Sequence, residues 1–203
     1  MEHFHSLGLD KSKLHDAHPL QVLDPSFNVS LIRSCFVLAT LSEELEMNDV
    51  AQRNYTWAHR NLEALENLWS DLYRQYFCQD RTTGQLIESN SVGGLLAVFA
   101  SIHHTRAQAI ALRIEQISID CRFSIPSHDP TDSRFDAKNY WRGPVWLIVN
   151  NMINDGLEAT DLEKSFTKIV DDSLELISSS GCAEYYDPKT GEAFGGDSSL
   201  EPL

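Results

Sequence analysis

Apolar residues recur at steps of three and four along most of this chain, and this spacing constrains the fold more than any other feature. From Phe27 to Leu45 they lie on one face of a predicted helix, which begins after the capping signal Asp24-Pro25-Ser26. Alternating strand patterns are almost absent, so the sequence predicts an all-α fold of packed helical hairpins. Short turns and one long loop, at 121–138, join this helix to further helical patterns at 50–77, 92–102, 107–117, 140–157 and 162–177.

The composition excludes several classes of partner. The chain has 203 residues, of which 16 are basic and 30 acidic, and its formal net charge is −14. This length suits one domain with its own core. So acidic a chain lacks the basic face that nucleic acid or an anionic membrane requires. No apolar run reaches the roughly 18 residues that span a bilayer, and no signal-peptide stretch opens the chain, so we expect no membrane contact and a cytoplasmic location.

Metal ligation and disulfide bonding are not indicated. Residues 1–24 are polar and hold four histidines whose spacing fits no recognised ligand set. We expect them to form a solvated terminal segment before a domain at 25–203. The four cysteines lie 43, 43 and 61 residues apart, too far for a metal knuckle, and Cys35 is expected to be a small core residue. No cofactor is implied.

Two turn signals resemble each other. Asp80-Arg81-Thr82-Thr83-Gly84 follows the second helical pattern, and Asp187-Pro188-Lys189-Thr190-Gly191 follows the last one, 107 residues later. In such turns Asp accepts hydrogen bonds from the backbone ahead of it, and Gly adopts a positive φ. The pair fits either helix pairs repeated around an axis or two independent hairpins.

Aromatic residues are densest in Tyr-Trp-Arg-Gly-Pro-Val-Trp at 140–146. Pro144 suits the first turn of a helix, and Gly143 allows close backbone approach just before it. Flat aromatic faces pack against sugar rings, and Arg142 offers a fork of donors to hydroxyls or a carboxylate. The alternative is an aromatic-rich core in which Arg142 has a structural partner.

A second segment could carry a catalytic carboxylate. Glu184 follows a helix end and is flanked by aromatic residues and glycines, which suits a side chain presented to a cavity. Such a carboxylate could take a proton from water. By itself, Glu184 fits an ordinary acidic surface residue better than a catalytic one.

Together, these segments resemble the C-terminal part of glycoside hydrolase family 63 catalytic domains, and within them the bacterial and fungal proteins related to mannosylglycerate hydrolase. The resemblance covers residues from about 20 to 197. The motifs that carry it are Tyr-Trp-Arg-Gly-Pro-Val-Trp at 140–146, Glu-Tyr-Tyr-Asp-Pro-Lys-Thr-Gly-Glu at 184–192, Gly195-Gly196, Pro-Ser-Phe-Asn at 25–28, Ser-Val-Gly-Gly-Leu at 91–95, and Pro126, Asp129-Pro130 and Arg134-Phe135-Asp136.

The resemblance implies part of an (α/α)6 barrel and hydrolysis of an α-glucosyl or α-mannosyl linkage with inversion. Inversion uses two carboxyl groups roughly 6.5–9.5 Å apart, one as general acid and one as general base. By position, Glu184 matches the general base. The residues that match the wall of the sugar pocket are Tyr140, Trp141, Arg142, Trp146 and, more weakly, Asn150.

The chain also departs from the family. The general acid belongs to an earlier family motif that these 203 residues lack, and Asp129, Asp132 and Asp136 match loop positions instead. About six of the barrel's twelve helices are visible, so we expect a fragment truncated at both ends, inactive alone and prone to associate through exposed apolar helix faces. The alternatives are a non-catalytic carbohydrate-binding or interaction module and an unrelated helical scaffold, which would bury both Tyr140 and Trp146 in packing.

Overall fold

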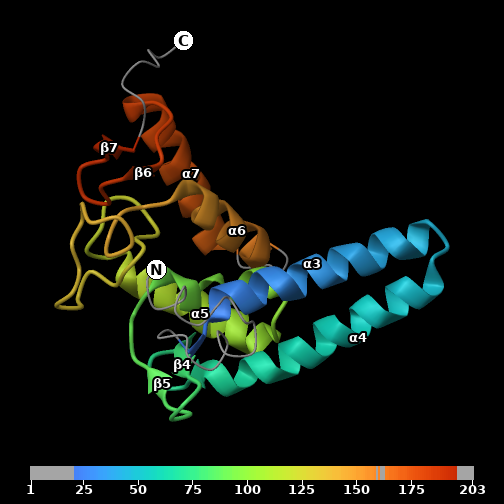
Figure 1. Cartoon of the computed structure of the whole chain (residues 1–203). Coiled ribbons are helices and arrows are strands. Elements are labelled where there is room, and N and C mark those ends of the chain that lie inside the picture. The colour runs from blue at the N-terminus through green and yellow to red at the C-terminus, as the bar shows by residue number, and fades with distance from the viewer. Residues whose placement is uncertain (1–20, 159, 161–162, 196–203) are drawn as a thin grey trace, which may run out of the picture.

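Two long antiparallel helices open the structure. The computed structural model describes residues 21–158, 160 and 163–195, and in it α3 (Pro25–Glu44) and α4 (Asn48–Leu65) form a hairpin that extends away from the other elements (Figure 1). Asp24 caps α3, because its carboxylate accepts a hydrogen bond from the Ser26 amide at 2.8 Å. One face of α3, which includes Cys35, is buried, as the sequence predicts for that residue.

The helix predicted at 50–77 is wrong beyond Leu65. There the chain forms the 3-10 helix η1 (Glu66–Leu68) and the hairpin of β2 (Trp69–Ser70) and β3 (Gln75–Tyr76). Tyr76 is buried, and its hydroxyl donates to the Glu66 carboxylate at 2.7 Å. The Arg106 guanidinium lies 4.3 Å from the centre of the Trp69 ring. These tertiary contacts override a spacing that also suits a helix.

Both predicted turns close hairpins of the same geometry. The first joins β4 (Cys78–Asp80) to β5 (Leu86–Ile87), and the second joins β6 (Tyr185–Tyr186) to β7 (Ala193–Phe194). In each turn the Asp side chain accepts two backbone amides ahead of it, and the glycine has a φ of +71° at Gly84 and +77° at Gly191. The repeated motif therefore folds the same way twice.

The last residues of the terminal segment predicted at 1–24 belong to a small sheet of the fold. β1 (Val22–Leu23) pairs with β4 in a three-stranded sheet of order β1-β4-β5. The four histidines of that segment lie outside the described residues. In the described part of the chain, no helix is both long and apolar enough to cross a membrane.

The middle of the chain packs around short 3-10 helices. The stretch predicted as one helix at 92–102 is instead η2 (Val92–Gly94) and η3 (Leu96–Ala100), followed by α5 (His104–Ile117). Gly94 explains the tight packing, because a Cβ built there would lie 2.0 Å from the Tyr76 carbonyl oxygen. The main core gathers side chains from α3, η3, α5 and the last two helices, α6 (Leu147–Glu158) and α7 (Glu163–Ser180).

The helix predicted at 140–157 begins only at Leu147, so Pro144 does not lie in its first turn. The Pro144 carbonyl instead accepts the Ser127 amide at 2.9 Å. The next residue, Val145, exchanges backbone hydrogen bonds with Tyr186, at 2.7 and 3.0 Å. This short bridge brings the aromatic segment against the β6–β7 hairpin.

Candidate functional site

Glu184 lies on a short loop between α7 and β6. The buried Tyr186 fixes this loop, because its hydroxyl donates to the Gly181 carbonyl at 2.6 Å and accepts the Ala183 amide at 2.9 Å. The Glu184 amide donates to the Phe194 carbonyl at 3.1 Å. The backbone of Glu184 is thus held on both sides while its side chain remains exposed.

Tyr140 contacts the Glu184 carboxylate directly. Its hydroxyl donates to Glu184 Oε1 at 2.7 Å, and this hydrogen bond to a carboxylate raises the pKa of the Tyr140 phenol above its usual value. Tyr140 has a φ of +33°, an uncommon conformation for a residue with a side chain. Backbone strain of this kind concentrates at binding and catalytic sites.

Gly195 leaves room for the other side of the carboxylate. A Cβ built on Gly195 would lie 2.4 Å from Glu184 Oε2 and 2.7 Å from Glu184 Cβ. Its φ of +71° also favours glycine. Within the described residues, Glu184 Oε2 accepts no hydrogen bond, whereas Oε1 accepts one.

The loop that carries Tyr140 is held by its own backbone. The Asp136 amide donates to the Arg142 carbonyl at 2.8 Å, and the Gly143 amide donates to Ser127 Oγ at 3.0 Å. A Cβ at Gly143 would lie 2.3 Å from the Asp136 carbonyl oxygen, as the predicted close approach requires. Trp146 Nε1 donates to the Tyr140 carbonyl at 2.9 Å. The hydrogen bond from the Trp146 ring and the backbone contacts of the loop together fix the position of Tyr140.

Four aromatic rings form one continuous stack beside Glu184. Trp141 lies on Trp146 with centroids 4.1 Å apart and planes 4° apart. Trp146 continues onto Tyr185 at 5.1 Å, and Tyr185 continues onto Phe194 at 5.6 Å. Tyr140 meets the first three of these rings edge-on. Such offset and edge-to-face contacts stabilise a rigid aromatic surface.

The structure brings most of the predicted site residues together. Tyr140 is 46% exposed and Trp141 48%, whereas Trp146 is 6% exposed and supports them from beneath. The half-exposed Tyr140 does not fit the scaffold alternative, which buries it. Arg142 is exposed, and its side chain has no hydrogen bond or ion pair within the described residues.

Asn150 is not brought to this surface. It is fully buried in α6, and its amide group donates to the Ser124 carbonyl at 2.6 Å. Its position is that of a packing residue which ties α6 to the loop at 121–138.

Sequence reasoning missed three residues of this surface as site residues: Tyr185, Phe194 and Lys138. The turn at 187–191 held the signal, because a hairpin closed there pairs Tyr185 with Phe194 and places their rings on one face. Lys138 lies 5.4 Å from the Phe194 ring centre and 2.5 Å from a Glu192 oxygen. No local pattern indicates that long-range contact.

The loop carboxylates have structural partners, in line with their assignment to loop positions. Asp129 is 3% exposed and pairs with Arg113, while it also accepts the Thr131 amide at 2.8 Å. Asp132 accepts from Arg134 at 2.7 Å, which holds the pKa of Asp132 well below its usual value.

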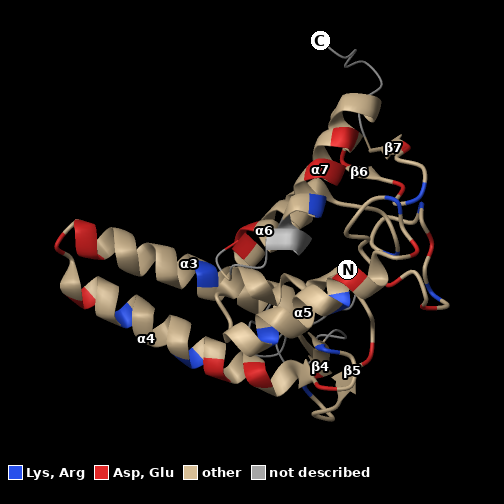
Figure 2. Cartoon of the chain, turned by 180° about the vertical axis from the view of Figure 1, so that it is seen from behind, with Lys and Arg blue, Asp and Glu red and all other residues tan. Residues whose placement is uncertain are grey.

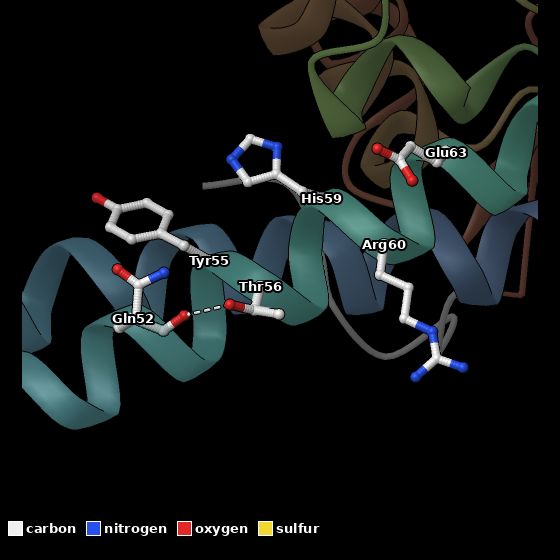
Figure 3. A pocket seen from close by; sticks show the side chains of 6 residues that line it. All are labelled: Gln52, Tyr55, Thr56, His59, Arg60 and Glu63. Carbon is white, nitrogen blue, oxygen red and sulfur yellow. Dashed lines mark hydrogen bonds between the residues drawn. The ribbon is translucent and has the colours of Figure 1, made fainter.

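A hollow on the outer surface of α4 is a separate candidate. Figure 3 shows that its side chains diverge, with Arg60 pointing away from His59 and Tyr55. One hydrogen bond in this view, from Thr56 Oγ1 to the Gln52 carbonyl at 2.8 Å, is internal to the helix. The lining therefore offers no convergent set of groups. It consists of Gln52, Tyr55, Thr56, His59, Arg60 and Glu63.

Known proteins are similar to this chain in both sequence and fold. The chain is 34% identical over 194 residues to mannosylglycerate hydrolase MGH1 of Selaginella moellendorffii, a match that covers 95% of this chain and 40% of the relative. It is 33% identical over 198 residues to the mannosylglycerate hydrolase of Thermus thermophilus, and this match covers 96% of this chain and 46% of the relative. The chain thus spans less than half the length of these relatives.

A solved structure agrees with this relationship. The family 63 mannosylglycerate hydrolase of Thermus thermophilus, solved in complex with glucose, superposes with a TM-score of 0.91 at 32% identity. The superposition covers 97% of this chain and 50% of the other, and it confirms the predicted partial helical barrel. The sequence model described as the mannosylglycerate hydrolase MGH1-like glycoside hydrolase domain matches residues 1–199. The chain therefore belongs to the MGH1-like mannosylglycerate hydrolase group of glycoside hydrolase family 63.

Proposed function

We propose that this chain is the base-bearing C-terminal part of an inverting α-glycosidase that hydrolyses glycosylglycerates or related α-glucosyl and α-mannosyl substrates. The observation that carries the proposal is the exposed Glu184 carboxylate, which accepts a hydrogen bond from Tyr140 at Oε1 and, within the described residues, none at Oε2, beside a stack of aromatic rings. A general base needs one oxygen positioned and one free for water. The membership of a hydrolase family supports the same role.

In this proposal Glu184 accepts a proton from a water molecule as the water oxygen attacks the anomeric carbon. The bond from that carbon to the glycosidic oxygen breaks, and a general acid protonates the leaving oxygen. These 203 residues lack the family motif that holds the acid. The exposed faces of Tyr140 and Trp141 would pack on the sugar ring, and Arg142 would donate to hydroxyls or to a carboxylate. The chain alone then binds sugar without turning it over.

The test is a reconstitution. The full chain is mixed with a separately produced polypeptide, the part of the Thermus thermophilus hydrolase that the chain does not match, and mannosylglycerate and glucosylglycerate hydrolysis is followed by proton NMR. We expect no turnover by the chain alone and release of the β-anomer by the mixture. Glu184→Gln should abolish turnover and leave the sugar-induced change in tryptophan fluorescence intact.

Two outcomes would contradict the proposal. Hydrolysis that survives Glu184→Gln would exclude Glu184 as the base. A stable complex that binds sugar and never hydrolyses it would favour the alternative, a carbohydrate-binding module.

A further inference from the structure

One helix carries apolar side chains on two separate faces. α3 buries Val29 and Ile32 against the core, yet Phe27 and Leu31 point to solvent. A step of two residues turns about 200° around a helix, so the two sets lie on different faces. Six of the eighteen large apolar side chains that are exposed in the described part of the chain lie between residues 27 and 45. A helix that is apolar on both sides is typical of one that is buried on both sides.

The exposed face has a regular spacing, and we call it the α3 seam. Leu31, Leu38 and Leu45 recur every seven residues, and so do Phe27, Ser34 and Leu41. The five apolar members are between 49% and 79% exposed. Interleaved sevens of this kind are the a and d positions of a helix-against-helix contact. The seam therefore fits one partner helix of similar length, with a bulky side chain opposite Ser34.

The seam is also uncharged. Arg33 is the only charged residue of α3 before its last turn, and Figure 2 shows α3 tan apart from one blue band and the red of its C-terminal end. The Arg33 guanidinium lies over the Phe99 ring, 5.1 Å from its centre. The chain as a whole carries a net charge of −14, so a second copy would bring two strongly acidic molecules together. A less acidic partner is favoured over self-association.

The length of the relatives indicates what that partner is. The solved hydrolase superposes on nearly all of this chain, which covers only half of it. We infer that the α3 seam is the docking surface for the helices of the hydrolase domain that this chain does not match, with one of them packing along Phe27 to Leu45. The inference rests on the proposed function for the identity of the partner, and it concerns assembly, not catalysis.

The test measures complex formation by size-exclusion chromatography with light scattering. The full chain is mixed with the unmatched part of the Thermus thermophilus hydrolase, and we expect a one-to-one complex. Ser34→Lys should weaken binding at least about tenfold, because it buries a charge in an apolar contact. The double variant Leu31→Lys, Leu38→Lys should abolish the complex. Leu72→Lys, at a position that is 81% exposed and off the seam, is the matched control.

Ser34→Lys also guards against misfolding, because Ser34 is exposed and Lys is a better helix former than Ser. The inference is overturned if no complex forms, if the complex is indifferent to the seam variants, or if the chain alone is a dimer that these variants dissociate. A seam-dependent complex without hydrolysis would instead count against the proposed function only.

Discussion

The Tyr140–Glu184 contact sets the chemistry of the site at the level of single residues. Because the raised pKa of Tyr140 comes chiefly from its hydrogen bond to Glu184, Glu184→Gln should lower it toward the usual value near 10. The change is checked by titrating tyrosinate absorbance at alkaline pH, with Tyr140→Phe to assign the signal. Tyr73, whose pKa is raised by Glu88, is the internal control and should not move.

The sign of the stability effect follows from the same shift. The folded state favours the neutral phenol of Tyr140, so this contribution is fully present below pH about 10 and is lost as the pH rises through the folded pKa. A Tyr140 titration that is unchanged by Glu184→Gln would show that the hydrogen bond does not persist in solution.

Alanine substitutions at Gly195 and Gly84 distinguish backbone strain from steric clash, because both glycines have the same φ of +71°. A Cβ at Gly84 meets nothing within 4 Å, whereas a Cβ at Gly195 meets the Glu184 side chain. We expect Gly84→Ala to cost about 1 kcal/mol of unfolding free energy from backbone strain alone. Gly195→Ala should cost roughly 1–3 kcal/mol more. Urea denaturation measures both, and equal losses would mean that Glu184 swings aside freely.

At the scale of elements, capping and spacing predicted the long helices well. The start of α3 followed from Asp24-Pro25-Ser26, and the structure assigns the cap to Asp24. Asp24→Ala should lower the unfolding free energy by about 1 kcal/mol, because it leaves the Ser26 amide without its side-chain acceptor. Ser30→Ala, on the exposed surface of the same helix, is the control and should change it by a few tenths of a kcal/mol at most. Urea denaturation of both variants checks this, and equal effects would argue against the cap.

The spacing of apolar residues predicted helix ends wrongly where tertiary contacts determine the backbone conformation. The helix predicted at 50–77 ends at Leu65, because the hairpin that follows lets Trp69 contact Arg106 and Tyr76 contact Glu66. These contacts stabilise the fold more than further helical turns would. The start of α6 shifted to Leu147 because Val145 pairs with Tyr186, forty-one residues away. Local sequence carries no record of such contacts.

The candidate site was predictable only in part. Glu184 and the aromatic segment were found from their motifs, whereas the ring stack depends on the β6–β7 register and on one bridge between distant segments. Asn150 has the spacing of a pocket residue, one turn beyond Trp146, but faces the interior. Because α6 begins at Leu147, the aromatic segment before it is not helical, and Asn150 does not lie on the same helix face as those rings.

At the scale of the whole molecule, the loop at 121–138 contacts the segment that follows the β4–β5 hairpin. Asp132 accepts hydrogen bonds from Arg134 and from Asn90, which follows β5, and lies 3.3 Å from His128. The hydrogen bonds from Arg134 chiefly, and the nearby His128, depress the pKa of Asp132. Asp132→Asn should therefore lower the unfolding free energy at neutral pH by about 1–2 kcal/mol, because hydrogen bonds to a carboxylate that is only 8% exposed are lost.

The pH dependence distinguishes this charge from a packing effect. A depressed pKa gives stability that is present above the unfolded value near 4 and is lost as the pH falls toward the folded one, so the difference between wild type and Asp132→Asn should narrow below about pH 4. Urea unfolding at several pH values measures it. Asp71→Asn is the control, because Asp71 also pairs with an arginine but is 89% exposed, and solvent screens that pair. A constant difference at every pH would assign the loss at Asp132 to shape, and the loop would then be held by packing alone.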